Sequence, residues 1–186
     1  MARHVEHGRA LLAGLPEAGR VLDLGSGGGL PGLVIATYRP KLELTLLEAR
    51  QRACRFLREA IVALGRPDVT VVEARAEEAA RRAELREVFD AVVARSFGPP
   101  AVTAECGVGF LRLSGRLVVS EPPAEDGPEA APVRWPADGL GDLGFAAAVA
   151  RGSEPGGSFV VLEKNRGDDR WPRRVGLPAK RPLWTV

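Results

Sequence analysis

The sequence has 186 residues, enough for one domain of ordinary size with a sizeable hydrophobic core. Its composition, 45% hydrophobic and 27% charged, excludes a disordered or fibrous chain, and no apolar run approaches the roughly 20 residues that cross a bilayer. The net charge of +2 is too small to indicate a polyanionic partner, and the first residues contain no apolar leader, so we expect a cytoplasmic protein.

Strand-like and helix-like segments alternate along the first 120 residues. The predicted elements are, in chain order, strand 21–24, helix 31–39, strand 42–47, helix 50–64, strand 69–73, helix 75–87, strand 89–94, helix 101–111 and strand 116–120. The strands are continuous apolar runs, which are typical of a parallel sheet covered on both faces. Right-handed crossovers make such a sheet doubly wound.

The segment 50–64 carries the clearest helical pattern. Its apolar residues recur with helical spacing, and Phe56 and Leu64 belong to the predicted inner face. Cys54 and Cys106 both fall in predicted helices, which favours buried thiols over a disulfide. Neither cysteine has the spacing of a metal ligand, so no metal site is predicted.

The pattern changes after residue 120. Residues 121–140 are rich in proline, glycine and acidic residues and are predicted to form a long loop. The apolar runs 145–150 and 159–164 are separated by a turn-rich connection, which predicts an antiparallel strand pair. The expected fold is therefore α/β, with a doubly wound, mostly parallel Rossmann-like sheet and a C-terminal antiparallel strand pair.

A glycine-rich turn, "DLGSGGGLPG", follows the first predicted strand. Glycine lets the backbone approach a ligand closely because it has no Cβ, and doubly wound sheets bind ligands beyond the carboxyl ends of their strands. Gly27, Gly29 and Gly32 also satisfy the G-x-G-x-x-G fingerprint of dinucleotide-binding proteins. The turn alone therefore leaves a nicotinamide cofactor and S-adenosylmethionine as alternatives.

Acidic residues at the ends of three successive strands favour S-adenosylmethionine. Asp23 precedes Gly25 by two residues, where a carboxylate suits an ammonium group better than a pyrophosphate. Glu48 ends the second strand and is placed to bind both ribose hydroxyls, although both cofactor classes share this acid. Glu77 is either a third contact or a carboxylate stabilised at a helix N-terminus. We predict that Gly25, Gly27 and Glu48 bind the cofactor.

Five segments resemble the glucose-inhibited division B (GidB) family, also called RsmG. In chain order they are "DLGSGGGLPGLVIA", "LTLLEARQRACRFL", "RAEE", "FDAVVARSF" and "WPRRVGLPAKRPL". Members of that family are class I methyltransferases that modify N7 of one guanosine in small-subunit (16S) ribosomal RNA. The resemblance implies a single S-adenosylmethionine-dependent methyltransferase domain over 1–186, with a short helix in 1–19 and a basic tail in 164–186.

The resemblance also implies particular contacts to the cofactor. By position these come from Gly25 and Leu30 in the glycine turn, Ala76 and Glu77 after the third strand, and Arg95 after the fourth. A cation at the carboxyl end of a central strand is also suited to a carboxylate or phosphate. An ion pair with a surface acid is the alternative for Arg95.

The C-terminal segment is basic. Residues 164–181 contain seven basic and two acidic side chains, a local charge of +5, and Trp171 and Trp184 lie in or just after them. Basic groups interleaved with aromatic rings can follow an RNA backbone, which makes this segment a candidate RNA contact. The candidate residues are Arg173, Arg174, Lys180 and Arg181. The alternative is a tail that packs its tryptophans on the domain.

Two positions depart from the family pattern. Glu121, in "VVSEPPAE", stands where the family has a lysine near the substrate, and Gly157 and Ser158 stand where an arginine often precedes the last strand. These changes leave two other functions open. One is a relative that methylates another substrate, such as a small molecule, and the other is a non-catalytic protein that binds the cofactor or RNA.

The sequence offers no catalytic Ser/His/Asp or Cys/His set, and no catalytic residue is predicted. Guanine N7 has an in-plane lone pair and no proton, so its methylation needs in-line approach and exclusion of water but no general base. Pro99 and Pro100 are followed by alanine, not by the aromatic residue typical of methyltransferases that act on exocyclic amines. A ring nitrogen of ribosomal RNA, free or in the small subunit, is therefore the expected acceptor.

Overall fold

The computed structural model describes residues 2–122, 133–146 and 150–186, and within them seven strands form one sheet in the order β3-β2-β1-β4-β5-β7-β6. The strands are β1 (Gly19–Leu24), β2 (Leu42–Glu48), β3 (Thr70–Glu73), β4 (Phe89–Ala94), β5 (Leu111–Glu121), β6 (Ala150–Glu154) and β7 (Gly157–Glu163). Strands β1 to β5 are parallel, and β7 pairs antiparallel with both β5 and β6. The predicted sheet, including its antiparallel end, is confirmed.

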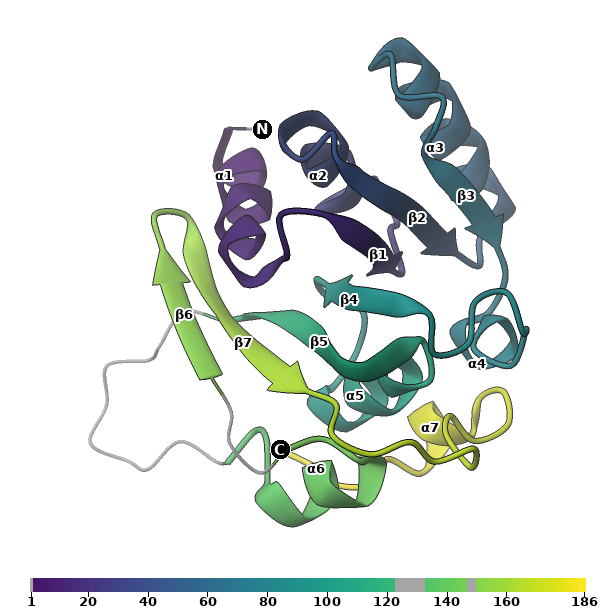
Figure 1. The fold of residues 1–186 in the computed structure, drawn as a ribbon, viewed down its shortest axis with the longest axis vertical. Helices are drawn as coiled ribbons and strands as arrows, with labels where there is room; N and C mark the ends of the chain where they lie inside the picture. Colours follow the sequence, from purple (N-terminus) through teal and green to yellow (C-terminus); the bar gives the residue numbers. More distant parts are fainter. Residues whose placement is uncertain (1, 123–132, 147–149) are drawn as a thin grey trace.

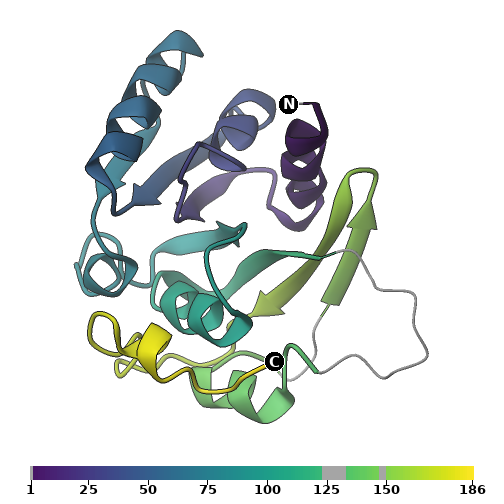
Figure 2. The same cartoon turned by 180° about the vertical axis from the view of Figure 1, so that it is seen from behind.

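Helices cover both faces of the sheet (Figure 1). They are α1 (Ala2–Ala10), the 3-10 helix η1 (Leu11–Gly14), α2 (Gly32–Tyr38), α3 (Gln51–Ala63), α4 (Ala76–Ala79), α5 (Pro100–Val108), α6 (Ala137–Leu143) and α7 (Leu177–Lys180). Figures 1 and 2 show α1, α2 and α3 on one side of the sheet and α4 to α7 on the other. In both views α1 lies beside the β6–β7 hairpin, which it also contacts.

Each face of the sheet has its own hydrophobic core. Val21 and Val93 pack with α2 and α3 residues, whereas Leu22 and Val92 pack with residues of α4 and α5. Neighbouring residues of a strand point to opposite faces, so a strand buried on both faces must be apolar at nearly every position. This is why short continuous runs located the central strands within a few residues.

The predicted helix at 75–87 is wrong beyond its first turn, because α4 ends at Ala79. Arg81 and Arg86 do not line a solvated helix face. Their guanidinium groups donate to the carbonyl oxygens of Pro172 (2.6 Å) and Trp171 (3.1 Å) in the C-terminal segment. Contacts distant in sequence thus replace the helix that the local composition favours.

The segment 50–64 does form a helix, α3, but only part of its predicted inner face is buried. Cys54, Leu57 and Ile61 are buried, whereas Phe56 and Leu64 are exposed. Because α3 packs near the β2–β3 edge, the sheet covers a narrower stripe than the apolar pattern suggests. Cys54 and Cys106 are buried free thiols, as predicted.

The prediction was least accurate between residues 111 and 154. Strand β5 begins at Leu111, five residues before the predicted start, and α6 occupies part of the predicted loop 121–140, of which 123–132 lie outside the described residues. Strand β6 begins only at the last residue of the predicted strand 145–150, and 147–149 are not described. Among the described residues, no helix is both long and apolar enough to cross a membrane.

Candidate active site

The glycine turn between β1 and α2 is fixed to the end of β2. The backbone N–H groups of Gly25 and Ser26 both donate to the carbonyl oxygen of Leu47 at 2.9 Å. Gly25 has φ +74°, and a Cβ at this position would lie 2.5 Å from Cδ2 of Phe97. A side chain at Gly25 would therefore strain the backbone and collide with the aromatic ring that follows β4.

Asp23 anchors the start of α2. Its Oδ2 accepts a hydrogen bond from the Gly32 N–H at 3.0 Å, and a Cβ on Gly32 would lie 2.5 Å from that oxygen. Its Oδ1 has no partner among the described residues. Burial raises the pKa of Asp23 to about 7, and the nearby charge of Glu48 adds to this effect. A cation near the turn would compensate this buried charge, as expected for an acid that faces an ammonium group.

Glu48, at the end of β2, is buried but ionised. Its Oε2 accepts from the Gly27 N–H at 2.9 Å, and its Oε1 accepts from the Arg50 N–H at 2.8 Å and Nε at 3.1 Å. Partial burial acts to raise the pKa of Glu48, but these hydrogen bonds outweigh it and hold the pKa below its usual value. The carboxylate therefore remains an acceptor at neutral pH.

A first cavity of about 350 Å³ lies at the carboxyl ends of β1, β2 and β3. Gly25, Glu48 and Ala76 line it, together with Arg75 and Phe97. This volume falls within the range of small-molecule sites. Three of the residues that the sequence assigned to the cofactor thus surround one cavity, although their elements are far apart in the chain.

A second cavity of about 330 Å³ adjoins the first, at the carboxyl ends of β4 and β5. Ser96 and Phe97 line both cavities, and Ser96 has the left-handed backbone conformation (φ +55°) that turns the chain after β4. Arg95 lines the second cavity and not the first. The two cavities are therefore neighbours that share Ser96 and Phe97 as part of their walls.

Three other predicted cofactor residues, Gly27, Leu30 and Glu77, do not line the first cavity. Gly27 is held by its N–H bond to Glu48, and Leu30 is half-buried in the turn. Glu77 accepts a hydrogen bond from the Gly176 N–H at 2.9 Å. Its carboxylate thus contacts the C-terminal segment in this structure.

The C-terminal segment packs against the domain. Trp171 is buried and donates from Nε1 to the Asp142 carbonyl, and Arg173 forms a two-pronged ion pair with buried Glu105 on α5. The other three predicted RNA contacts, Arg174, Lys180 and Arg181, are exposed. Packing of the tail therefore engages Arg173 and leaves the other three cations at the surface.

Several residues of the second cavity were missed by the sequence analysis. His7 comes from α1, Glu121 from the end of β5, and Arg134 and Trp135 from the segment before α6. Two of the lining residues did carry a signal: Phe97 belongs to the "FDAVVARSF" segment, and Glu121 stands where the family has a lysine near the substrate. In the described part of the chain, no three His, Cys, Asp or Glu side chains are grouped to hold a metal ion.

The fold resembles those of solved methyltransferases. SibL, described as an S-adenosylmethionine-dependent methyltransferase in its apo form, aligns with a TM-score of 0.65 at 22% identity over 86% of this chain and 55% of its own. The precorrin-6y C5,15-methyltransferase from Geobacter metallireducens aligns with a TM-score of 0.57 at 16% identity over 86% of both chains. The sheet and its glycine turn are those of the Rossmann-like class I methyltransferases.

Sequence comparison identifies the family within that class. The GidB family model, described as rRNA small subunit methyltransferase G, matches residues 1–122. The ribosomal RNA small subunit methyltransferase G of Rubrobacter xylanophilus is 41% identical over 91% of this chain and 67% of its own length. That of Moorella thermoacetica is 36% identical over 91% of this chain and 71% of its own. The chain belongs to the GidB family, which confirms the resemblance seen in its motifs.

Proposed function

We propose that this protein transfers a methyl group from S-adenosylmethionine to N7 of a guanine in small-subunit ribosomal RNA. The observation that carries the proposal is the first cavity, where Gly25, Glu48 and Ala76 meet in a chain of the GidB family. Methyltransferase activity and the RNA substrate are in line with the names of its relatives. The N7 position is the finer part of the proposal and rests on the chemistry of the acceptor.

The residues of the first cavity fit the proposed cofactor. The ionised carboxylate of Glu48 is an acceptor for ribose hydroxyls, and the bare backbone at Gly25 allows close approach of a ligand. The buried Asp23, with its unpaired Oδ1, lies near the turn, and a bound ammonium group would favour its ionised form. When bound, S-adenosylmethionine supplies an electrophilic methyl group on a sulfonium ion. We propose that Leu30, Glu77 and Arg95 support this binding from the surrounding turns.

The second cavity is the proposed place of the acceptor base. A ring nitrogen with a free lone pair needs no proton removed, so the residues around it have to orient the base and exclude water. Phe97, shared by both cavities, is an apolar surface on which a planar base can stack. The proposed mechanism requires positioning from these residues and no general base.

Calorimetry and a transfer assay test the proposal together. S-adenosylhomocysteine is titrated into the wild type, Gly27→Asp and Gly28→Ala. The aspartate puts a side chain on a left-handed backbone (φ +52°), with its Cβ 3.5 Å from Arg50 Nη2 and 4.0 Å from Glu48 Oε2, so it should disturb the Arg50–Glu48 pair and abolish binding. A Cβ at Gly28 meets no atom of the described residues within 4 Å, so that variant should bind normally.

In the transfer assay, wild-type protein is mixed with labelled S-adenosylmethionine and an unmodified small-subunit RNA transcript or the assembled subunit. Label recovered in N7-methylguanine supports the proposal. Cofactor binding followed by methylation of a small molecule alone would favour the repurposed relative. Binding without transfer to any RNA or extract would favour a non-catalytic protein, and tighter binding of a nicotinamide dinucleotide would contradict the cofactor assignment.

A further inference from the structure

The wall of the second cavity contains a cluster of charged groups that the proposed chemistry does not use. Glu121, at the end of β5, accepts hydrogen bonds at Oε1 from Trp135 Nε1 (3.2 Å) and Arg134 Nε (3.3 Å). Its Oε2 lies 3.2 Å from Arg134 Nε and 3.7 Å from Arg151 Nη1. The Glu121 side chain is only 8% exposed. One carboxylate thus joins three residues from two different segments.

Arg134 is the member of this cluster that is placed to contact a ligand. It lines the second cavity, and its side chain is 35% exposed. Glu121 binds only its Nε–H, and among the described residues the terminal amino groups of Arg134 have no hydrogen-bond partner. A guanidinium held at one edge presents its other edge in a fixed plane, which suits the oxygens of a phosphate.

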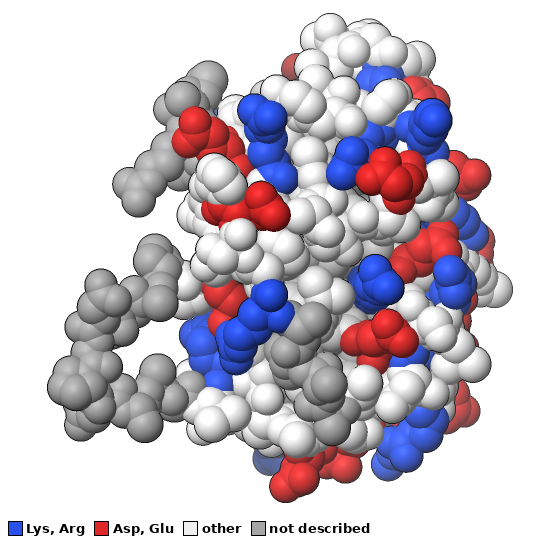
Figure 3. Space-filling model, turned by 60° about the vertical axis from the view of Figure 1, so that its left-hand side comes forward, with Lys and Arg blue, Asp and Glu red and all other residues white. Residues whose placement is uncertain are grey.

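The backbone beneath Arg134 is held independently of its side chain. The Arg134 carbonyl accepts a hydrogen bond from Trp184 Nε1 at 3.0 Å, and Trp135 is buried in the core. Replacement of the Arg134 side chain therefore leaves this segment anchored. Figure 3 shows basic and acidic groups interspersed over one face of the molecule. A mixed surface of this kind favours individual contacts over a broad basic patch for binding a polyanion.

We propose that Arg134 binds a phosphate of the RNA strand that carries the acceptor base, and that Glu121 is the positioning residue that holds Arg134 and Trp135 on the cavity wall. This inference rests on the proposed function, because it assigns an RNA contact to the same acceptor site. It also gives the acid at the end of β5 a role that is compatible with an anionic substrate. Two arginines accompany Glu121, so the cluster remains cationic.

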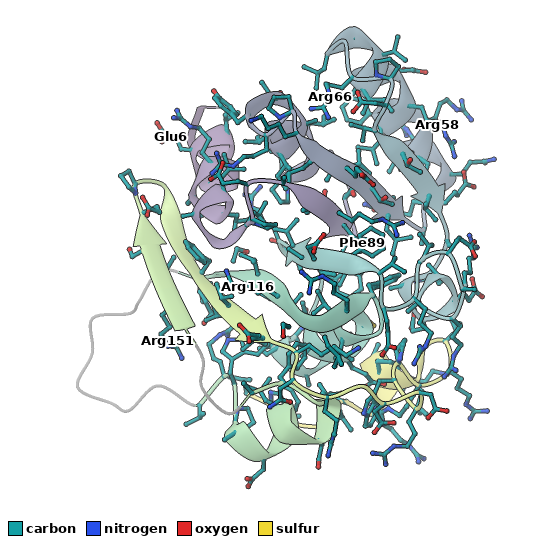
Figure 4. All side chains as sticks on the ribbon, viewed as in Figure 1. Glu6, Arg58, Arg66, Phe89, Arg116 and Arg151 are labelled. Atoms are coloured by element: carbon teal, nitrogen blue, oxygen red, sulfur yellow. The ribbon has the colours of Figure 1, made fainter. Side chains whose placement is uncertain are left out.

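Salt-dependent binding of the unmodified small-subunit RNA transcript tests the role of Arg134. Arg134→Ala should weaken binding about tenfold or more, and it should reduce the slope of log affinity against log salt by about 0.7 to 0.9 because one phosphate contact is lost. Arg134→Lys keeps the charge and should retain the slope while losing part of the affinity. The matched control is Arg116→Ala. Arg116 lies on β5 (Figure 4), the same strand as Glu121, but it pairs with Glu163. This variant should leave the slope unchanged.

Glu121→Gln separates positioning from simple electrostatics. The variant removes a negative charge, so an electrostatic effect alone would tighten RNA binding. Loss of the anchor for Arg134 should instead weaken it several-fold and raise KM for RNA with kcat unchanged. Cofactor affinity and melting temperature are measured for each variant to confirm that the first cavity is intact.

Unchanged RNA affinity and salt slope in Arg134→Ala, with normal transfer by the wild type, would overturn the inference alone. Tighter RNA binding by Glu121→Gln would overturn the positioning role. A wild type that binds the cofactor but neither binds nor methylates the transcript would overturn the proposed function and this inference with it.

Discussion

Removing one partner of the ion pair between Arg173 and Glu105 should destabilise the protein strongly. Glu105 lies in α5 with 0% of its surface exposed. Its Oε1 accepts from the Arg173 N–H (2.9 Å) and Nε (2.8 Å), and its Oε2 accepts from Nη2 at 2.6 Å. Replacing Arg173 by alanine leaves a buried carboxylate with only one of these three hydrogen bonds. Burial of an unpaired charge is among the most destabilising changes in a protein.

The expected loss follows from the geometry. Breaking a buried ion pair from one side costs about 3–5 kcal/mol. The Arg173 side chain is 24% exposed, so water can reach the carboxylate once the guanidinium is gone, and the lower end of about 3 kcal/mol applies. For a chain of this length each kcal/mol lowers the melting temperature by roughly 2–4 °C, so Arg173→Ala should melt about 6–12 °C below the wild type.

Thermal unfolding followed by circular dichroism measures this shift. Arg170→Ala is the matched control, because the Arg170 side chain is 68% exposed where it pairs with Asp168, and it should melt within about 2 °C of the wild type. Glu105→Gln removes the buried charge, so adding Arg173→Ala to that variant should cost only about 1 kcal/mol. A wild-type-like melting temperature for Arg173→Ala, or an equal loss in both backgrounds, would refute the reasoning.

Three further predictions concern the turn and the buried titratable groups. Gly25→Ala should lose cofactor affinity because its Cβ would meet the neighbouring aromatic ring at 2.5 Å, whereas Gly28→Ala should not; calorimetry compares them. Burial raises the pKa of Asp23 to about 7, so its contribution to stability is present in full below about pH 3.9 and is lost as the pH rises through about 7. The free energy of unfolding of Asp23→Asn should therefore rise relative to that of the wild type between about pH 4 and 7, by on the order of 4 kcal/mol in denaturant titrations without ligand. A difference in unfolding free energy that does not change with pH would contradict this. Burial also raises the pKa of Cys54 and Cys106, so neither thiol should react with a disulfide reagent at pH 8 until the protein is unfolded.

The central strands were predictable because their burial shows in the sequence as short, continuous apolar runs. β2 and β4 were located within a residue or less, since a strand covered on both faces is apolar almost throughout. The first half of β5 was missed, because Arg112 and Ser114 are exposed there and interrupt the pattern. Its hydrogen bonds to β4 and to the segment after β7 are set by tertiary structure. No window of sequence contains that information.

The residues of the first cavity were easier to predict from the sequence than those of the second. Gly25 and Glu48 lie at or just after strand ends, so the rule that ligands bind at the carboxyl ends of parallel strands brings them together from sequence alone, whereas Ala76 was assigned through the family resemblance. The second cavity joins His7 with Glu121 and Trp135, which come from three separate segments. Their meeting depends on how α1 and the segment before α6 pack, and neither has a periodic signal that fixes its place.

The C-terminal segment shows how a local charge count differs from a surface charge. Lys164 is buried, with its Nζ 2.7 Å from Glu87 Oε1, and Arg173 is held by Glu105. Two of the seven cations are thus paired with acids outside the segment. The test of RNA binding by the tail should therefore retain Arg173, and replace only the exposed cations Arg174, Lys180 and Arg181. If they contact RNA, the triple variant should lower the salt slope by about 2 and leave the melting temperature unchanged.

The C-terminal segment also contacts α4, so the triple variant must be checked for cofactor binding before its effect on RNA is interpreted. The Gly176 N–H donates to Glu77, which follows Ala76 on the wall of the first cavity, and Arg81 holds the Pro172 carbonyl. A disturbance of the tail can therefore reach the cofactor side through α4 without any change in RNA contacts. Lower methylation by a tail variant indicates an RNA contact only where S-adenosylhomocysteine still binds with wild-type affinity. A fall in both affinities would instead identify the tail as part of the wall that supports the cofactor.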